Sequence, residues 1–262
     1  AMIYIEPATE ALDEALAIRP AAVDDPRQDA AHGLRLWRRL SDALDTDKLW
    51  LRTPDMQGVL NTAGLIVQQE ALLMAMIEQP DAVHRWLDRA CGFLVDLARY
   101  ERERTAGRVG GNIWPTTFFP ADLGISFTED MMPLLPPELY AEFGIPQLRR
   151  LQGEFGGLHI HCCGAYGQHV PALVEADLNI AAIEFHHPHT TLEQVMPLAE
   201  RGAVLVPYLS AERQDEFDSP IAYWRWLLEH APPSARFWFA AVDAEPETLT
   251  FVREVVGGGA GR

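Results

Sequence analysis

From residue 107 onward, strand-length apolar runs alternate with stretches of helical spacing. The apolar runs predict strands at Gly111–Trp114, Gly124–Thr128, Leu158–Cys163, Ile180–Phe185, Val204–Tyr208 and Phe237–Ala241. The intervening spacing predicts helices at Pro137–Leu151, Ala165–Ala176, Leu192–Arg201, Ile221–Glu229 and Pro246–Val256. This alternation is typical of parallel strands joined by crossover helices.

The N-terminal part is richer in helical patterns. Two strands are expected here, at Met2–Glu6 and Lys48–Thr53, and they bring the total to eight. Helices are expected at Asp29–Leu44, at Leu65–Glu78 and from Pro80 to about Thr105. Eight strands with helices between them predict an α/β fold, a (β/α)8 barrel of the TIM type that is irregular or shortened at its N-terminus. Residues 1–262 are interpreted as a single domain.

Composition narrows the function classes. Hydrophobic residues make up 48% of the chain, enough for a full core, and the net charge is −17. Such an acidic protein is a poor match for nucleic acid or an anionic membrane, so neither is expected as a partner. The three cysteines suggest no disulfide framework, and no apolar run is long enough to cross a bilayer. Without a recognisable secretory leader, a cytoplasmic location is expected.

The stretch from Gly156 to Gly164 carries the strongest chemical signal. Side chains alternate between the two faces of a strand, so His159, His161 and Cys163 are predicted to share one face. Two imidazoles and a thiol at the C-terminal end of a strand suit a metal such as zinc. The alternative is that each histidine is a hydrogen-bonded core residue. Cys162 points to the opposite face and is expected to be a packing residue.

Other polar residues stand where the predicted strands end, which is where barrel enzymes place their active sites. Glu129 and Asp130 form one candidate pair for proton transfer, although Asp130 could instead cap a helix. Glu184 and His186 form a second pair, followed by His187 and His189, which could be exposed loop residues. The aromatic residues at two further strand ends are candidates for binding a cofactor: Trp114 and Tyr208.

Several common sites are not indicated. The chain has no glycine-rich dinucleotide fingerprint, no phosphate-binding lysine motif and no nucleophile elbow. Nucleotide cofactors and serine hydrolysis are therefore unsupported.

Two central motifs and one upstream segment resemble a known family. Met131–Arg150 (MMPLLPPELYAEFGIPQLRR) resembles the SPE-x-F-x-EF-x-x-P-x-L stretch of the uroporphyrinogen decarboxylase superfamily. The run from His161 to Gly164 is similar to the His-x-Cys-Gly of its cobalamin-dependent methyltransferase branch. The upstream segment Pro54–Gly64, with Glu78–Asp81 further on, also looks like this family.

The resemblance implies a TIM-type barrel with zinc bound by His161 and Cys163. It also implies an acceptor thiol that is activated by the zinc and receives a methyl group from a corrinoid protein. The sequence departs from the family because no cysteine follows Cys163. His159, Glu184, His186 or Asp243 could replace that missing ligand. The arginine-rich opening motif of the true decarboxylases is also absent, which argues against uroporphyrinogen itself as the substrate.

Three hypotheses follow from the sequence. The first is a zinc-dependent enzyme that transfers a methyl group to a small thiol from a corrinoid or another donor, with His161, Cys163 and His159 as ligands. The second is a metal-free decarboxylase or other lyase acting on a carboxylate substrate, in which Glu129, Asp130 or Glu184 would handle protons. The third is a non-catalytic relative that binds a small molecule or a corrinoid.

Overall fold

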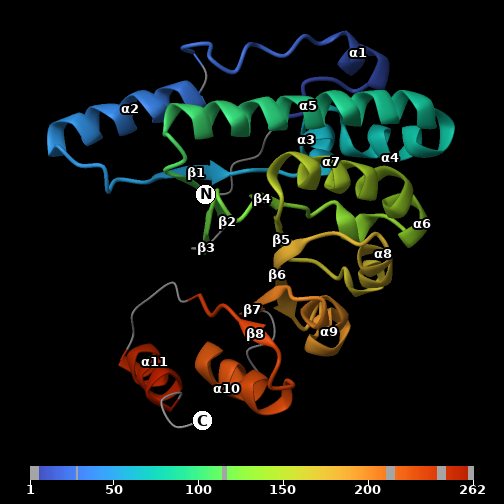
Figure 1. Cartoon of the computed structure of the whole chain (residues 1–262). Helices are drawn as coiled ribbons and strands as arrows, with labels where there is room; N and C mark the ends of the chain where they lie inside the picture. Colours follow the sequence, from blue (N-terminus) through green and yellow to red (C-terminus); the bar gives the residue numbers. More distant parts are fainter. Residues whose placement is uncertain (1–5, 28, 114–116, 211–215, 241–245, 259–262) are drawn as a thin grey trace.

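A parallel five-stranded sheet forms the centre of the protein. The computed structural model describes residues 6–27, 29–113, 117–210, 216–240 and 246–258. The strands follow one another in sequence order and all pair in parallel (Figure 1). They are β4 (Ile125–Thr128), β5 (Leu158–His161), β6 (Ile180–His187), β7 (Val204–Leu209) and β8 (Arg236–Phe237).

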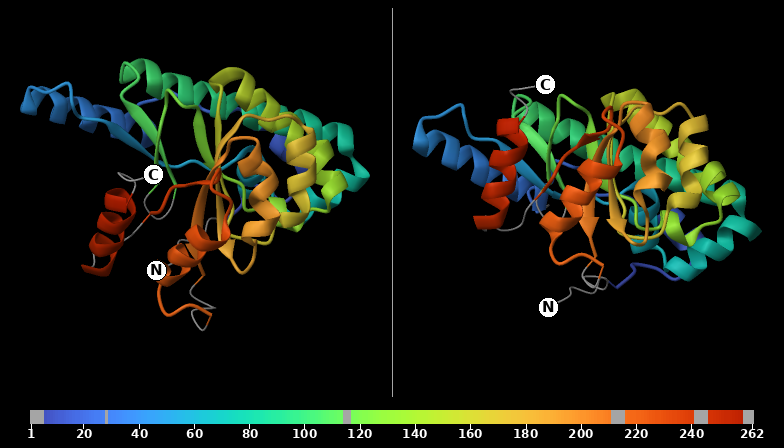
Figure 2. Two further views of the ribbon diagram at one scale, coloured as in Figure 1. Left: turned by 60° about the horizontal axis from the view of Figure 1, so that its bottom comes forward. Right: turned by 90° about the horizontal axis from the view of Figure 1, so that it is seen from below.

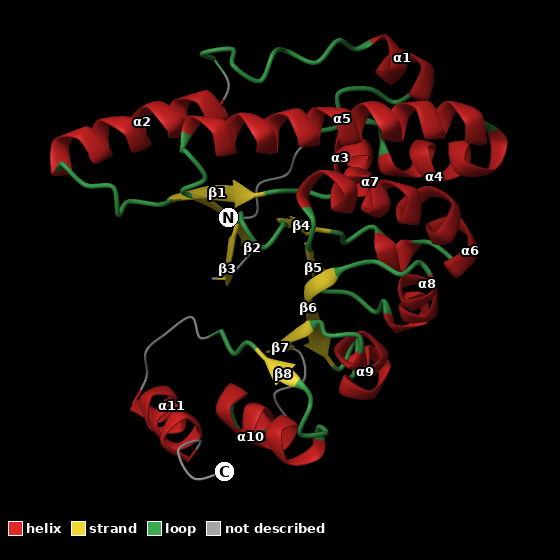
Figure 3. Ribbon diagram, viewed as in Figure 1, coloured by secondary structure: helices red, strands yellow, loops and turns green. Residues whose placement is uncertain are grey.

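Helices connect these strands and cover one face of the sheet, as the coloured ribbons show (Figures 2 and 3). The helices after β4 to β7 are α7 (Ile145–Phe155), α8 (Val170–Glu175), α9 (Leu192–Glu200) and α10 (Pro220–His230), and α11 (Pro246–Gly258) follows β8. Short turns of helix precede α7 and α8: η1 (Met132–Leu134), α6 (Pro137–Leu139), the π-helix η2 (Tyr140–Gly144) and η3 (Gly167–His169). The repeated strand–helix order is the reason for the parallel pairing.

A second, smaller sheet has a different topology. Its strands are β1 (Leu51–Asp55), β2 (Val109–Ile113) and β3 (Thr117–Pro120). β1 and β2 pair in parallel, but β3 returns antiparallel to β2. A single bridge between Gln57 and Thr128 links the end of β1 to the end of β4. At this seam, β2 lies so close to β4 that a Cβ at Gly111 would stand 2.4 Å from the Cβ of Ser126.

Helices also form the N-terminal part of the chain. α1 (Leu12–Ala17) and α2 (Asp29–Leu44) precede β1, and α3 (Val59–Ile66), α4 (Gln69–Glu78) and α5 (Pro80–Arg104) follow it. α5 is the longest of the described helices and runs across the small sheet and alongside α3 and α4 (Figure 1). None of the helices that the structure describes is both long and apolar enough to cross a bilayer.

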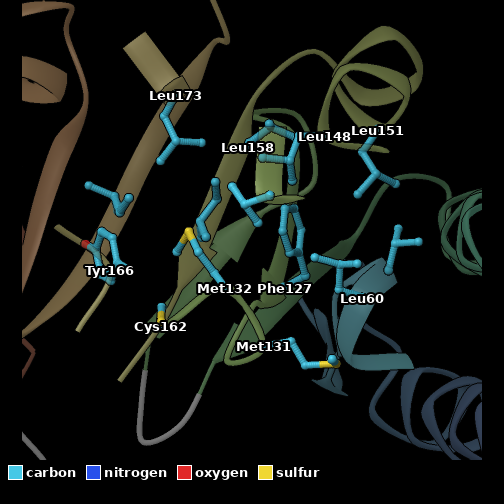
Figure 4. Packing of buried hydrophobic residues seen from close by; sticks show 14 of the residues in the cluster. Leu60, Phe127, Met131, Met132, Leu148, Leu151, Leu158, Cys162, Tyr166 and Leu173 are labelled. Atoms are coloured by element: carbon cyan, nitrogen blue, oxygen red, sulfur yellow. The ribbon is translucent and has the colours of Figure 1, made fainter. Parts of the chain in front are cut away.

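The main core lies between the five-stranded sheet and its helices. Phe127 and Leu158 from neighbouring strands pack against Leu148 and Leu151 of α7 (Figure 4). Met132 and the fully buried Cys162 belong to the same cluster. Cys162 is therefore a packing residue, as the alternation in β5 predicted.

The structure corrects three expectations about the fold. Within the described residues, the strands form two sheets, and no closed barrel of eight strands is present. The helix expected over Leu65–Glu78 is present as α4 only from Gln69 onward, because the chain is extended at Val67, and Leu65 and Ile66 belong to α3. The strand β3 was not expected at all. The expected first strand, Met2–Glu6, lies outside the described residues except for Glu6, which is not in a strand.

Candidate functional site

The carboxyl ends of β4, β5 and β6 bring together most of the polar residues singled out in the sequence. Thr128 pairs with His161 across the first two strands, and Glu184 lies on the third. Since parallel strands end at the same edge of the sheet, the residues that follow each strand gather there. Asp130 follows β4, and Cys163 follows β5.

His161 and Glu184 form the buried centre of this group. His161 Nδ1 lies 2.5 Å from Glu184 Oε2, and the glutamate side chain is fully buried. Its second oxygen, Oε1, lies 3.6 Å from Nε2 of the fully buried His159. The carboxylate therefore lies between two histidines on the same face of β5, as alternation predicts for His159 and His161, while Cys163 lies beyond the end of the strand.

The charge states of these groups follow from their contacts. Burial alone would lower the pKa of His161, but hydrogen bonds with Cys163 and Glu184, together with nearby carboxylates, raise it to about 10. Burial alone would raise the pKa of Glu184, but its two histidine partners lower it to about 2. Without a metal, the pair is thus an imidazolium and a carboxylate at neutral pH.

Asp130 and Cys163 lie on the exposed side of His161. Asp130 Oδ1 accepts hydrogen bonds from the backbone N–H of Cys163 at 3.0 Å and from its thiol at 3.3 Å. The same oxygen stands 4.0 Å from His161 Nε2. Carboxylate, thiol and imidazole thus face one another at the surface end of the site.

His186 completes the group from β6. Its ring lies edge-on to that of His161, with 5.4 Å between centroids, and stacks on Tyr208 of β7 at 5.0 Å. Burial, and then the charge of His161, lowers the pKa of His186 to about 4, so its imidazole is neutral. Its buried Nε2 has no hydrogen-bond partner among the described residues. A neutral imidazole with a free nitrogen is the form that binds metals.

Two sets of side chains could each hold a metal ion within the described part of the chain. One is Asp130, His161 and Cys163, and the other is His161, Glu184 and His186. In each set the possible ligand atoms all lie within 4.8 Å of one another. Because Glu184 occupies His161 Nδ1, only Nε2 remains for a metal, and this nitrogen faces Asp130. The first set is therefore the better candidate, with Glu184 orienting the histidine.

His159 is not a member of either set. Its Nδ1 lies 3.2 Å from the Ser126 hydroxyl, and its ring packs against Phe119 and Trp238. It occupies the layer below His161, deep in the sheet. The structure therefore places it behind the candidate metal ligands, where it holds Glu184.

Glu129 lies apart from Asp130 in spite of their adjacency. Its side chain turns inward and is 2% exposed, and Oε1 has no hydrogen-bond partner in the described part of the chain. Burial, and then the charge of Asp130, raises the pKa of Glu129 to about 8. The absence of a Cβ at Gly58 makes room for this carboxyl, since a Cβ there would stand 2.1 Å from Oε2.

Asp55 is a site residue that the sequence reasoning did not select. The hydroxyl of Thr128 donates to its Oδ1 at 2.7 Å, and its pKa is raised mainly by burial and also responds to His161, Asp130 and Glu184. Its position two residues after the predicted strand Lys48–Thr53 is the signal in the sequence that points to it.

The remaining candidates lie elsewhere. Trp114 and Asp243 fall outside the described residues. His187 Nε2 makes a contact of 2.6 Å with Glu216 Oε2 and belongs to neither candidate metal set. His189 follows β6 in a turn and is exposed.

The comparisons with known proteins agree with the fold. No protein-family model matches the sequence, and no curated protein sequence matches it. Its structure is similar to that of a methyltransferase from Methanosarcina mazei, with a TM-score of 0.63 and 14% sequence identity. The match covers 96% of this chain and 69% of that one. At this identity the similarity shows a shared α/β fold and does not by itself assign an activity.

Proposed function

We propose that the protein is a zinc-dependent methyltransferase, which passes a methyl group from a corrinoid or another donor to a small thiol. The proposal rests on one observation: Asp130, His161 and Cys163 converge at the carboxyl ends of parallel strands. The fold that holds them is similar to a methyltransferase. The His-x-Cys-Gly resemblance in the sequence supports the same chemistry.

The residues present fit a zinc ion. Zinc takes nitrogen, sulfur and oxygen donors, and an imidazole, a thiol and a carboxylate are available here. The unpartnered Nε2 of His186 could provide a fourth donor, or the fourth position could remain for the acceptor. When bound, zinc would lower the pKa of a thiol in its coordination shell and so supply a thiolate nucleophile.

The protein's own residues would prepare this site. Glu184 accepts the hydrogen bond of His161 Nδ1–H, so that Nε2 is directed toward Asp130. His159 in turn holds Glu184 from below. Because His161 carries a proton on both nitrogens before binding, zinc uptake would release a proton. If Oδ1 of Asp130 serves as the ligand, its second carboxylate oxygen, at the mouth of the site, would accept the proton of an incoming thiol.

The proposed reaction is a displacement at carbon. The acceptor thiolate attacks the methyl carbon, the bond between that carbon and the donor breaks, and its electron pair stays with the donor. The products are a methyl thioether and the demethylated donor. With methylcobalamin as the probe donor and 2-mercaptoethanol as the probe acceptor, the change in corrin absorbance reports turnover.

Metal content of the untagged protein tests the proposal. We expect close to one equivalent of zinc in the wild type and a large loss in Cys163→Ala and His161→Ala. His32→Ala, an exposed histidine on α2, is the matched control and should retain the metal. Zinc-free wild type, or unchanged metal content in Cys163→Ala, would contradict the proposal.

A second candidate function is a metal-free lyase or decarboxylase. It is supported by Glu129, a buried carboxyl whose raised pKa keeps it protonated at neutral pH and able to donate a proton. This function predicts turnover of a carboxylate substrate that survives a chelator and is lost in Glu129→Gln.

A further inference from the structure

A separate cavity of about 300 Å³ lies between the start of α2, the end of β1 and the middle of α5. These three elements lie next to one another in the upper part of Figure 1. The cavity is bounded by side chains from all three elements: Val23, Asp29, Ala30, Thr53, Asp55, Met56, Gln57, Phe93, Leu94, Leu97 and Glu101. Its volume is that of a small organic ligand.

One wall of the cavity is apolar. Phe93, Leu94 and Leu97 are three to four residues apart or adjacent on α5, so they line the same side of the helix. Met56 closes the wall from the loop after β1. A ligand that displaces water from this wall would gain from burial of its own apolar surface.

The polar groups of the cavity are mainly acidic. Glu101, one helical turn beyond Leu97, is only 5% exposed. Its carboxylate has no hydrogen bond or ion pair with any described residue, and burial alone raises its pKa to about 7. Asp55 uses Oδ1 to accept a hydrogen bond from Thr128, and Asp29 is a third acid. None of the lining residues is a lysine or arginine.

These features select the ligand class. A buried carboxylate without a partner is costly, and a cation with hydrogen-bond donors would remove that cost. A bare metal ion does not fit, since the three acids do not form a converging group among the described residues. The apolar wall favours an organic body on the cation.

We propose that this cavity binds a protonated primary or secondary amine with a compact apolar body. The body lies against Phe93 and Leu97, and an N–H group donates to Glu101. Asp55 also borders the candidate functional site, but none of the lining residues belongs to either candidate metal set, so this proposal does not depend on the proposed methyl transfer.

Titration calorimetry with benzylamine tests the site at about pH 8, above the pKa of Glu101. Benzyl alcohol is the neutral comparison of similar shape, and trimethylbenzylammonium is a cation without N–H donors. Wild type should bind benzylamine at least tenfold more tightly than either, since a charge-assisted hydrogen bond contributes about that much. Equal affinity for benzylamine and benzyl alcohol overturns the proposal. Equal affinity for benzylamine and trimethylbenzylammonium overturns the part of it that requires an N–H donor.

Two variants locate the binding. Glu101→Gln should reduce benzylamine affinity at least tenfold and leave benzyl alcohol binding unchanged, whereas Leu97→Phe should weaken both by filling the cavity. Glu103→Gln, an exposed acid two residues away on α5, is the matched control. Unchanged benzylamine affinity in Glu101→Gln overturns the assignment. Thermal melts check that each variant is folded. Zinc content is measured on the same samples, so that a failure of amine binding can be distinguished from a failure of the proposed zinc site.

Discussion

The two sheets of this protein differ in the direction in which their strands pair. The candidate metal centre lies at the five-stranded sheet, and the proposed amine-binding cavity lies next to the three-stranded one. In the five-stranded sheet, each strand leads into a helix and returns in parallel beside its predecessor. In the three-stranded sheet, β3 reverses direction after β2, and the next strand pairs elsewhere. In the five-stranded, regular sheet, polar residues at the carboxyl ends of neighbouring strands form the candidate metal centre. The irregular one leaves a cavity beneath α5 that contains a buried, unpaired acid.

The regular sheet depends on a close contact between its first two strands. Gly124 has a φ of +136°, and a Cβ there would stand 1.9 Å from the carbonyl oxygen of Gly157. Gly124→Ala therefore combines backbone strain with a clash against backbone, and we expect a loss of about 4 kcal/mol or more in the free energy of unfolding. Chemical denaturation measures this loss.

Gly153→Ala is the matched control for that change. Gly153 lies exposed within α7 with nothing within 4 Å of a Cβ, so alanine should stabilise the helix by about 0.5–1 kcal/mol. If Gly124→Ala were tolerated as well as Gly153→Ala, the close approach of β4 and β5 would not be needed for the fold.

The irregular region should respond to pH through Glu101. Its pKa is raised from 4.5 to about 7 in the folded protein, so the folded state holds a proton that the unfolded chain has already lost in this range. Stability is therefore fully present below about pH 4.5 and falls by about 3 kcal/mol as pH rises to about 7.

The difference in unfolding free energy between wild type and Glu101→Gln isolates this effect, because other titrating groups cancel. Glu103→Gln, which is exposed, should follow the wild type at every pH. A wild-type profile parallel to that of Glu101→Gln from pH 4 to pH 8 would show that the carboxylate is not buried in solution.

This contrast also explains what the sequence could predict. The strands from β4 to β7 and α9 and α10 were expected within a few residues, because apolar runs and helical spacing there agree with the final packing. Strand alternation put His159 and His161 on one face and placed Glu184 and His186 at the next strand end, but that His161 contacts both of them is a finding of the structure. β3 was missed because its neighbours Trp114 and Pro115 gave no distinct turn or strand period, and its partner strand is glycine-rich.

Other parts of the site could not be derived from patterns. Alternation places His159 and His161 on one face, but it does not predict how deeply each side chain is buried. His159 is the more deeply buried of the two, and it contacts Glu184 and Ser126 instead of joining the candidate metal ligands. Similarly, Glu129 and Asp130 are neighbours in sequence, yet the first is buried and the side chain of the second is 41% exposed. Asp55 enters the site only because an isolated bridge between Gln57 and Thr128 brings the end of β1 to the end of β4, a contact between distant segments.

The seam between the two sheets allows a direct test of their coupling. A Cβ at Gly111 would stand 2.4 Å from Ser126 Cβ, so Gly111→Ala should cost about 2 kcal/mol through overpacking. Replacing Ser126 by glycine in the same chain removes the clash and should restore part of the loss. A double mutant no more stable than Gly111→Ala alone would mean that β2 and β4 do not touch at this point.

The smallest expected effect concerns the support of the metal centre. Glu184→Gln preserves the shape that holds His161 Nδ1–H but removes the charge, so zinc affinity should fall about tenfold with unchanged stoichiometry. Competition with a chromogenic chelator measures the affinity, and Glu193→Gln on α9 is an exposed control. If Glu184 were itself a ligand in place of Cys163, Glu184→Gln would abolish binding and Cys163→Ala would spare it. The two variants together therefore decide which of the two converging sets holds the metal, and whether the deeper layer of the regular sheet acts as a ligand or as a support.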